Sequence, residues 1–263
     1  MSERTVLWLN DLQKAWESAV ERLTVSYMRP CVFFSGGLDS SWIAFSLKRL
    51  FPSMPLVVVG LKGCLDVQRA EAGARELGMH MEWVELTEDS VRQAVKGIQR
   101  VFPSAGKLDF DLGCVEWLAC AHARSLGCTH VFSGSGADAL FAGFDAFKNA
   151  LKRSGAEGVQ QEIIQRVRAW REKDGARLNA IAHQFSLAPV FPFMEEPFLS
   201  AALRVPVREK IRSPSDALRK HALRALAIKE GLPQSLALQS KKAMQYGSGS
   251  LKVLARLRRR HVV

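Results

Sequence analysis

Short apolar runs alternate with stretches of helical periodicity along the first half of the chain. The runs are too short for helices and rich in β-forming residues, so each predicts a strand. They occupy Cys31 to Phe34, Leu56 to Val59 and Thr129 to Ser133, and a strand is also predicted over His80 to Leu86, where apolar and polar residues alternate. The stretches that follow them predict helices over 40–50, 66–77, 87–101 and 111–126. Because strand and helix alternate, the pattern predicts an α/β fold with a parallel sheet and helices on both of its faces.

The remaining segments predict further helices. One apolar stripe predicts an amphipathic helix over 10–26, with Asn10 and Gln13 resembling a capping box. Its members are Leu12, Trp16, Ala19, Val20 and Leu23. Asp66 and Asp111 are predicted to cap the helices that begin beside them. A charged helical stretch at 160–172 is predicted to join the sheet to a helical C-terminal half.

Composition narrows the class of protein. Of the 263 residues 48% are apolar, which is enough for a normal core, and no apolar run is long enough to span a membrane. The N-terminus has no apolar run that could act as a signal peptide. Five cysteines without a C-x-x-C pair predict buried free thiols. We therefore expect a cytoplasmic protein.

The chain carries a formal net charge of +11, which predicts an anionic partner. The densest basic cluster is the tail from Arg256 to His261. A solvated C-terminus is the commoner explanation of such a cluster, and contact with nucleic acid is the alternative.

The stretch CVFFSGGLDSSW, residues 31–42, predicts a strand, a tight turn and a helix. Gly36 and Gly37 let backbone N–H groups approach a ligand closely, and the start of the helix adds further donors for phosphate oxygens. A carboxylate beside phosphates is repulsive unless a cation lies between them, so Asp39 points to Mg²⁺. An ordinary glycine turn with an aspartate cap is the alternative. No GK[ST] follows, which separates this loop from the common nucleotide-binding loop.

A second glycine loop, Gly134 to Phe144, follows the fourth predicted strand. Its first residues fit a dinucleotide fingerprint, but that motif needs a further strand ending in an acidic residue, and 152–159 has no strand character. The favoured interpretation is a second anion loop with Asp138 as a metal ligand. Together, Asp39 and Asp138 predict a Mg²⁺–pyrophosphate group held from both sides.

These motifs also resemble a known family. SGGLDS, residues 35–40, resembles the pyrophosphate loop of the N-type ATP pyrophosphatases. Ser133 to Phe144, SGSGADALFAGF, resembles the second motif of the synthetase domain of asparagine synthetases and their relatives. Further stretches resemble that domain in the same order, so the resemblance covers roughly 31–249. They are Val59 to Val67, Pro192 to Ile211, Arg219 to Leu232 and Ser240 to Gly249.

The resemblance implies a fold, ligands and roles. It implies the adenine nucleotide alpha hydrolase-like (PP-loop) fold and a single domain over 1–263. Within it, 1–30 would hold the N-terminal helix, 31–150 the nucleotide-binding core and 151–263 the mostly helical part. ATP would be bordered by Phe34, Val59, Gly60, Ser133 and Gly134. Its pyrophosphate would be held by Ser35, Gly36, Gly37, Leu38, Asp39 and Ser40. Asp39 and Asp138 would share Mg²⁺, and Lys241, or Lys242 beside it, would be the catalytic lysine.

Two departures from the family pattern bear on activity. Ser135 and Ala139 stand where the family has glutamates, and the first of those glutamates is associated with handling the incoming amine. About thirty residues precede the first loop, so no glutaminase domain is expected. Nitrogen would then come from ammonia, another amine or a separate glutaminase subunit.

The leading hypothesis is an ATP-dependent ligase that activates a small carboxylic acid, by default aspartate, as an acyl-adenylate and transfers the acyl group to nitrogen. The basic charge keeps a tRNA-modifying PP-loop enzyme as an alternative, although nucleic acid is not the favoured partner. The two departures suggest a third class, a catalytically impaired nucleotide-binding subunit.

Overall fold

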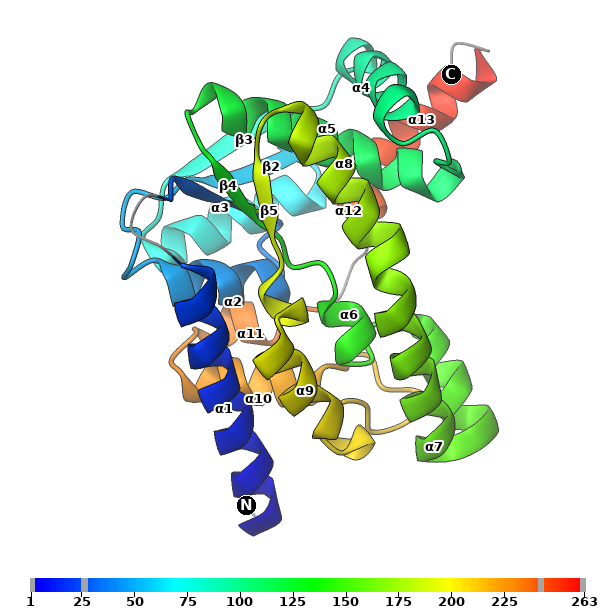
Figure 1. Ribbon diagram of the computed structural model, residues 1–263. Coiled ribbons are helices and arrows are strands. Elements are labelled where there is room, and N and C mark those ends of the chain that lie inside the picture. The colour runs from blue at the N-terminus through cyan, green and yellow to red at the C-terminus, as the bar shows by residue number, and fades with distance from the viewer. Residues whose placement is uncertain (1–2, 25–27, 241–243, 261–263) are drawn as a thin grey trace. The chain divides into compact units, whose positions relative to one another are not determined.

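The computed structural model describes residues 3–24, 28–240 and 244–260, with side chains from residue 7 onward. Within it the chain forms two compact units, each assembled from separate segments (Figure 1). The sheet unit comprises Tyr27–Ser133, Gly175–Val190 and Lys242–Val263, and the helical unit comprises Met1–Ser26, Gly134–Asp174 and Phe191–Lys241. The expectation of a single domain is not tested by this division and stays a prediction.

The sheet unit contains a five-stranded parallel sheet in the order β3-β2-β1-β4-β5. The strands are β1 (Pro30–Phe33), β2 (Leu56–Gly60), β3 (Met81–Glu85), β4 (His130–Phe132) and β5 (Ala188–Val190). The first four confirm the four strands predicted from the sequence. The fifth was not expected from the sequence, because three residues around a proline give no strand pattern; Pro189 is tolerated because β5 lies at an edge.

Helices cover both faces of this sheet, as predicted. α2 (Leu38–Leu47) and α3 (Leu65–Leu77) connect strands in one direction across the sheet, whereas α4 (Glu88–Val101), α5 (Lys107–Ser125) and α8 (Ala176–Gln184) belong to connections in the other. Since crossovers between parallel strands are right-handed, the two sets lie on opposite faces. β2 is buried along its whole length for this reason. Two short C-terminal helices complete the unit, α12 (Met244–Gly247) and α13 (Ser250–Arg259).

Two predicted helix caps are wrong. The N-cap of α3 is Cys64, and Asp66 lies buried in the first turn. α5 begins at Lys107, where the Gly106 N–H donates to the Asp109 carboxylate at 2.9 Å. Asp111 is therefore inside that helix and buried, and it pairs with Arg258 at 3.0 Å. An aspartate near a helix start looks the same in sequence whether it caps the helix or meets a distant cation.

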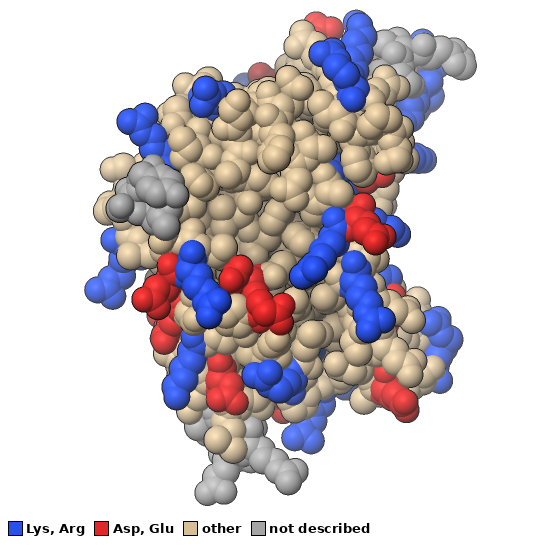
Figure 2. Space-filling view, viewed as in Figure 1, with Lys and Arg blue, Asp and Glu red and all other residues tan. Residues whose placement is uncertain are grey.

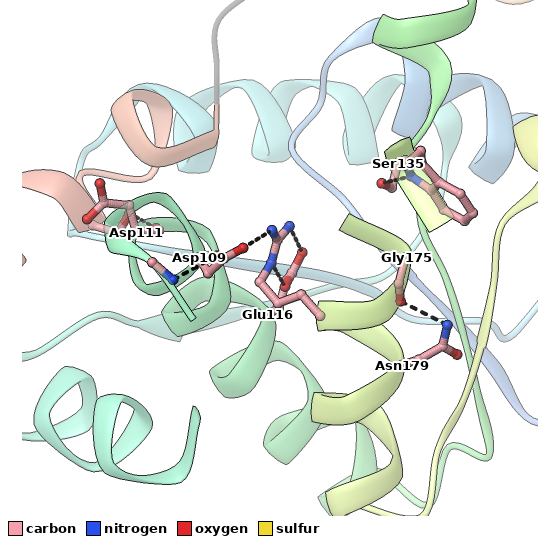
Figure 3. A network of polar contacts seen from close by, with 10 residues as sticks. Asp109, Asp111, Glu116, Ser135, Gly175 and Asn179 are labelled. Carbon is pink, nitrogen blue, oxygen red and sulfur yellow. Dashed lines mark hydrogen bonds and ion pairs between the residues drawn. The ribbon is translucent and has the colours of Figure 1, made fainter. Parts of the chain in front are cut away.

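A buried ion pair joins α5 to α8. The Arg177 guanidinium donates to both oxygens of Glu116, at 2.8 and 3.0 Å, and to Asp109 at 3.0 Å (Figure 3). Arg177 and Glu116 are both buried, so the paired geometry compensates the loss of hydration of each charge.

The helical unit begins with α1 (Glu3–Leu23). It continues with α6 (Ala137–Leu140), α7 (Asp145–Trp170), the π-helical turn Arg171–Gly175, α9 (Glu196–Arg204), α10 (His221–Lys229) and α11 (Gln234–Ala237), with 3₁₀ turns at Pro192–Met194 and Val207–Glu209. The predicted stripe of α1 is confirmed by the buried Leu12, Trp16 and Ala19. The predicted start is wrong, because Asn10 lies inside the helix and accepts a hydrogen bond from Lys229 at 2.6 Å.

The charged helical stretch predicted at 160–172 belongs to a longer helix. α7 starts at Asp145 and contains a kink where Gly155 adopts a left-handed φ of +61°. Its buried face includes Phe147, Val159 and Ile163, which form a core cluster with Ile211. The apolar residues on this face are spaced too widely around the kink to mark the helix in the sequence.

Two predictions from composition can be compared with the described residues. All five cysteines are free thiols; Cys64 is partly exposed, and the other four are buried. Among the helices in the described part of the chain, none is both long and apolar enough to cross a membrane. A cytoplasmic location stays a prediction. On the face drawn in Figure 2, Lys and Arg side chains are spread widely, with Asp and Glu side chains among them.

Lys210 is buried in the helical unit without a hydrogen-bond partner among the described residues. Its ammonium lies 5.9 Å from the centre of the Phe141 ring. Burial lowers the pKa of Lys210 from 10.5 to about 7, because an ammonium loses its hydration in the interior.

Lys210→Met should therefore stabilise the chain, by about 2 kcal/mol below pH 7, because an apolar side chain of similar length replaces a buried charge. Below pH 7 the folded and unfolded chains both carry the charge, and the folded chain pays its full desolvation cost. Between about pH 7 and 10.5 only the unfolded chain keeps the proton, so the stability of the wild type rises with pH and the advantage of the variant shrinks.

Urea denaturation of both proteins at about pH 6.5 and pH 9.5, followed by tryptophan fluorescence, measures this difference. Lys152→Met on the exposed side of α7 is the control and should leave the pH dependence unchanged. An advantage of Lys210→Met that is the same at both pH values would contradict the lowered pKa.

Candidate functional site

The first predicted loop lies at the carboxyl end of β1, which is the central strand of the sheet. The Phe34 N–H donates to the Val57 carbonyl at 2.8 Å, so the chain stays paired up to the loop. Ser35, Gly36 and Gly37 then turn the chain into α2. Ligands of open parallel sheets bind at this edge, beside strands whose connections leave in opposite directions, and β1 has such neighbours in β2 and β4.

Gly36 is required by the backbone of this loop. It adopts a left-handed φ of +67°, and a Cβ there would overlap the main-chain carbonyl of Arg69 on α3. Only glycine avoids both problems. Other residues are strained at this positive φ, and the Arg69 carbonyl, as part of the main chain, cannot rotate away from a Cβ as a side chain could. The loop therefore lies directly against the start of α3, which fixes its path.

Serine hydroxyls hold the loop from within. Ser40 Oγ donates to the Gly37 carbonyl at 3.2 Å and accepts the Ser35 N–H at 3.3 Å, while Ser35 Oγ accepts the Gly37 N–H at 3.4 Å. The two hydroxyl oxygens are 3.4 Å apart. At the start of α2 the first N–H groups have no acceptor within the helix, and such a helix start favours anions. The predicted residues thus form an ordered turn suited to phosphate oxygens.

Asp39 stands in the first turn of α2, beside Ser40. Mg²⁺ bound with a nucleotide usually takes one or two carboxylates, phosphate oxygens and water. Among the described residues no three His, Cys, Asp or Glu side chains gather as a metal site. A single half-buried carboxylate beside a phosphate loop fits a metal ion that arrives with its nucleotide.

The end of β2 lies beside this loop in the same sheet. Val59 and Gly60 are buried, and the Gly60 carbonyl accepts a hydrogen bond from the Trp83 indole at 3.1 Å. The next N–H, of Leu61, donates to the Ser248 carbonyl at 3.0 Å. The late segment 244–250 is thereby fixed to the strand end that the sequence associates with ATP. Lys241 and Lys242, just before it, lie outside the described residues.

Ser133 completes the strand ends of the sheet unit. It follows β4, is buried, and donates its N–H to the Val190 carbonyl at 3.0 Å. The sheet unit therefore brings the ends of β1, β2 and β4 to one edge. Gly134 and Asp138 belong to the helical unit. A Mg²⁺ ion shared by Asp39 and Asp138 thus involves both units and stays a prediction.

In the helical unit, Asp138 forms an ion pair with a buried lysine. Asp138 lies on the short helix α6, and Lys220 Nζ is 2.7 Å from its Oδ1. The Lys220 side chain is 3% exposed and that of Asp138 16%. A Cβ on Gly143 would overlap both side chains, so the glycine makes room for the pair. Sequence reasoning gave Lys220 no role, although it begins a K-x-x-LR pattern, Lys220 to Arg224, within the stretch Arg219 to Leu232 that resembles the synthetase domain.

The same pattern explains how Lys220 is presented. Arg219 and Lys220 both adopt left-handed φ, +49° and +53°, which is uncommon for two consecutive non-glycine residues. The buried Arg224 guanidinium donates to the carbonyls of Leu218 and Arg219, at 2.8 and 2.7 Å. The arginine of the pattern thus holds the strained turn from which the lysine projects. Strain of this kind is concentrated at functional sites.

The two departures from the family pattern lie in the same unit. The Trp170 indole N–H donates to Ser135 Oγ at 2.8 Å (Figure 3). Trp170 also packs edge-on against Phe191. Ala139 is buried on α6. At position 135, where the family pattern has a glutamate carboxylate, this chain has a serine hydroxyl that accepts a hydrogen bond from Trp170.

Comparison with known proteins gives a family match over most of the chain. The sequence model of the asparagine synthase family matches residues 11–158 and 151–261. The glutamine-hydrolyzing asparagine synthetase B of Escherichia coli is 25% identical over 254 residues, which are 91% of this chain and 45% of that protein. The glutamine-hydrolyzing asparagine synthetase 1 of Arabidopsis thaliana is 26% identical over 256 residues, 90% of this chain and 43% of that protein. The chain spans about half the length of the curated relatives it matches.

Among solved structures, the U34-tRNA thiolase of Methanococcus maripaludis aligns with 97% of this chain and 80% of its own. The identity is 13% and the TM-score 0.42, which is too low to support an argument about function.

Proposed function

The chain belongs to the asparagine synthase family, and on this basis we propose that it is an ATP-dependent ligase forming a carbon–nitrogen bond. The observation that carries the proposal is the family match over residues 11–158 and 151–261, which includes both glycine loops. In the proposed reaction a carboxylate oxygen attacks the α-phosphorus of ATP and pyrophosphate leaves. A nitrogen nucleophile then attacks the acyl carbon of the adenylate, and AMP leaves.

The sheet unit supplies the nucleotide-binding residues of this proposal except Gly134, which belongs to the helical unit. Backbone N–H groups at the start of α2, with the hydroxyls of Ser35 and Ser40, hold the β- and γ-phosphates. Val59 and Gly60 lie against the adenine, and Phe34, Ser133 and Gly134 complete the border. The internal hydrogen bonds of the loop support this assignment, because a preordered cradle loses little entropy on binding.

Magnesium is proposed as the ion that accompanies ATP. Asp39 would hold it in the sheet unit and Asp138 in the helical unit, where the Lys220 ammonium now compensates the charge of Asp138. The ion would neutralise charge on the departing pyrophosphate. Lys220 places a second cation at Asp138, so this chain can compensate the carboxylate before nucleotide and metal arrive.

The acid substrate and the nitrogen donor are proposed with the same reaction. Aspartate is the default acid. The Ser135 hydroxyl cannot act as a general base, as a glutamate at this position could. The nitrogen donor would therefore be ammonia that arrives neutral, from solution or from a separate glutaminase subunit. Lys241 is the proposed catalytic lysine, stabilising charge on the α-phosphate, and Lys242 is its alternative.

The test is a screen of carboxylic acids with ATP, Mg²⁺ and ammonia or hydroxylamine, measuring AMP and pyrophosphate. We expect both products in equal amounts and dependent on an acid. Lys241→Ala should lower turnover about 100-fold, since one charge that stabilises the transition state is lost. Lys242→Ala, which removes the same charge one residue away, is the matched control and should retain most of the activity.

Two outcomes would count against the proposal, and a third would change its assignment of the catalytic lysine. Production of ADP and phosphate alone would exclude adenylate chemistry. Loss of activity in Lys242→Ala rather than Lys241→Ala would exchange the roles of the two lysines. Nucleotide binding without turnover over a broad range of acids would favour an impaired subunit.

A second candidate, an enzyme that adenylates a base of tRNA, is favoured by the net charge of +11. The same assay separates the two candidates when tRNA replaces the carboxylic acid. Pyrophosphate release that requires tRNA and no acid would establish the second and overturn the first.

A further inference from the structure

Two rows of cationic side chains lie on neighbouring helices of the sheet unit. On α4, Arg92, Lys96 and Arg100 follow one another at intervals of four residues. On α13, the exposed cations are Lys252, Arg256 and Arg259, and Arg260 follows the helix. Residues four apart lie about 6 Å apart along one side of a helix, so each row is a line of charge.

Packing turns both rows outward. α4 buries Val91, Ala94, Val95 and Ile98, and α13 buries Val253, Leu254 and Leu257. The two helices pack against one another, and Arg260 pairs with Glu88 at 3.0 Å. That pair connects the end of one row to the first turn of α4, where the other row begins. The cations on the two helices therefore form one surface, which we call the α4–α13 surface.

Three of the cations on these helices are paired with carboxylates. Arg258 turns inward to the buried Asp111, whereas Arg260 pairs with Glu88 and Arg92 with Asp89, at 3.6 Å, in the first turn of α4. Apart from Arg258, the two helices and Arg260 thus contribute seven cations and two carboxylates to the surface. α13 contains no acidic residue, and α4 has none after Asp89. Figure 2 shows Lys and Arg side chains over α4 and beside the end of α13.

We propose that the α4–α13 surface binds the phosphate backbone of a double-stranded nucleic acid. Arginine dominates the surface, and its planar fork matches phosphate oxygens better than the hydrated ammonium of lysine does. Neither helix carries an aromatic side chain, whereas single strands are held largely by stacking on aromatic rings. Contacts limited to phosphates position the partner and read no base sequence. This binding goes beyond the proposed ligase and does not rest on it.

The test is fluorescence anisotropy of a labelled RNA duplex and a labelled DNA duplex with the full chain, without ATP, over a series of salt concentrations. We expect binding that weakens steeply with salt and does not depend on sequence. The triple variant Lys96→Gln/Arg256→Gln/Arg259→Gln should bind at least about tenfold more weakly. Its plot of log affinity against log salt should be flatter by about two to three units, as expected when three phosphate contacts are lost.

The matched control is Lys152→Gln/Arg153→Gln/Arg168→Gln, which removes one lysine and two arginines from exposed positions of α7. Arg256→Lys/Arg259→Lys keeps the charge of the surface and should keep most of the affinity. The proposal is overturned if both triple variants lose affinity equally, or if poly-glutamate binds as tightly as either duplex. It is also overturned if neither duplex binds at low salt.

Discussion

Gly36→Ala should weaken ATP binding by about 1,000-fold. The substitution adds one methyl group to a residue whose φ is +67° and whose Cβ position is occupied by the Arg69 carbonyl. Both obstacles are backbone atoms, so the loop itself has to move. Because Ser35 and Ser40 bond to the same turn, its movement displaces several phosphate donors together. A hydrogen bond to a charged group contributes about 1.5–3 kcal/mol, so the loss of two such bonds costs about 4 kcal/mol, which is about 1,000-fold in affinity.

A glycine elsewhere in the sheet unit provides the control. Gly78 ends α3 with a φ of +63°, and nothing lies within 4 Å of a Cβ built there. Gly78→Ala therefore suffers the same backbone strain, about 1 kcal/mol, without the steric overlap. Isothermal titration with ATP and Mg²⁺ should show near wild-type affinity for Gly78→Ala and about 1,000-fold weaker affinity for Gly36→Ala. Equal affinities in the two variants would show that the loop does not hold the phosphates.

This first loop was predictable from the sequence because its determinants are local. A buried strand ends, two glycines follow, and a helix begins. All three features are recognisable in the sequence within twelve residues, 31–42. β1, β2 and β4 were found for the same reason, since strands covered on both faces are apolar throughout, whereas the edge strand β3 was found from its alternation of apolar and polar residues. β5 was not predicted, because an edge strand of three residues that includes a proline has no recognisable strand pattern.

The second half of the candidate site depends on tertiary structure. Nothing near Asp138 in the sequence indicates that Lys220 pairs with it, nor that Arg224 holds the turn on which Lys220 lies. Asp66, Asp111 and Asn10 were misassigned as caps for a related reason. Each has a cap-like position in sequence. Asp111 and Asn10 take their roles from residues that are distant in the chain, Arg258 and Lys229 respectively.

Asp138→Asn should destabilise the chain by about 3–5 kcal/mol. The substitution leaves the Lys220 ammonium, which is 3% exposed, without its carboxylate partner at 2.7 Å, and an uncompensated buried charge is costly. Lys220→Met should cost less, because the carboxylate it leaves behind is 16% exposed and keeps part of its hydration. The double variant Asp138→Asn/Lys220→Met removes both charges and should recover most of the loss. Urea denaturation of all four proteins gives the coupling energy of the pair.

An ion pair of the same unit, between Glu162 and Arg166 on α7, shows whether burial, rather than pairing alone, sets this cost. Its length is similar, 2.6 Å, but the Arg166 side chain is 36% exposed and that of Glu162 27%. Glu162→Gln should therefore cost less than about 1 kcal/mol, as for pairs in contact with water. If Asp138→Asn were equally mild, water or another acceptor, rather than Asp138, would have to stabilise the Lys220 ammonium in the folded chain. The proposal that Lys220 compensates Asp138 before nucleotide and metal arrive would then fail.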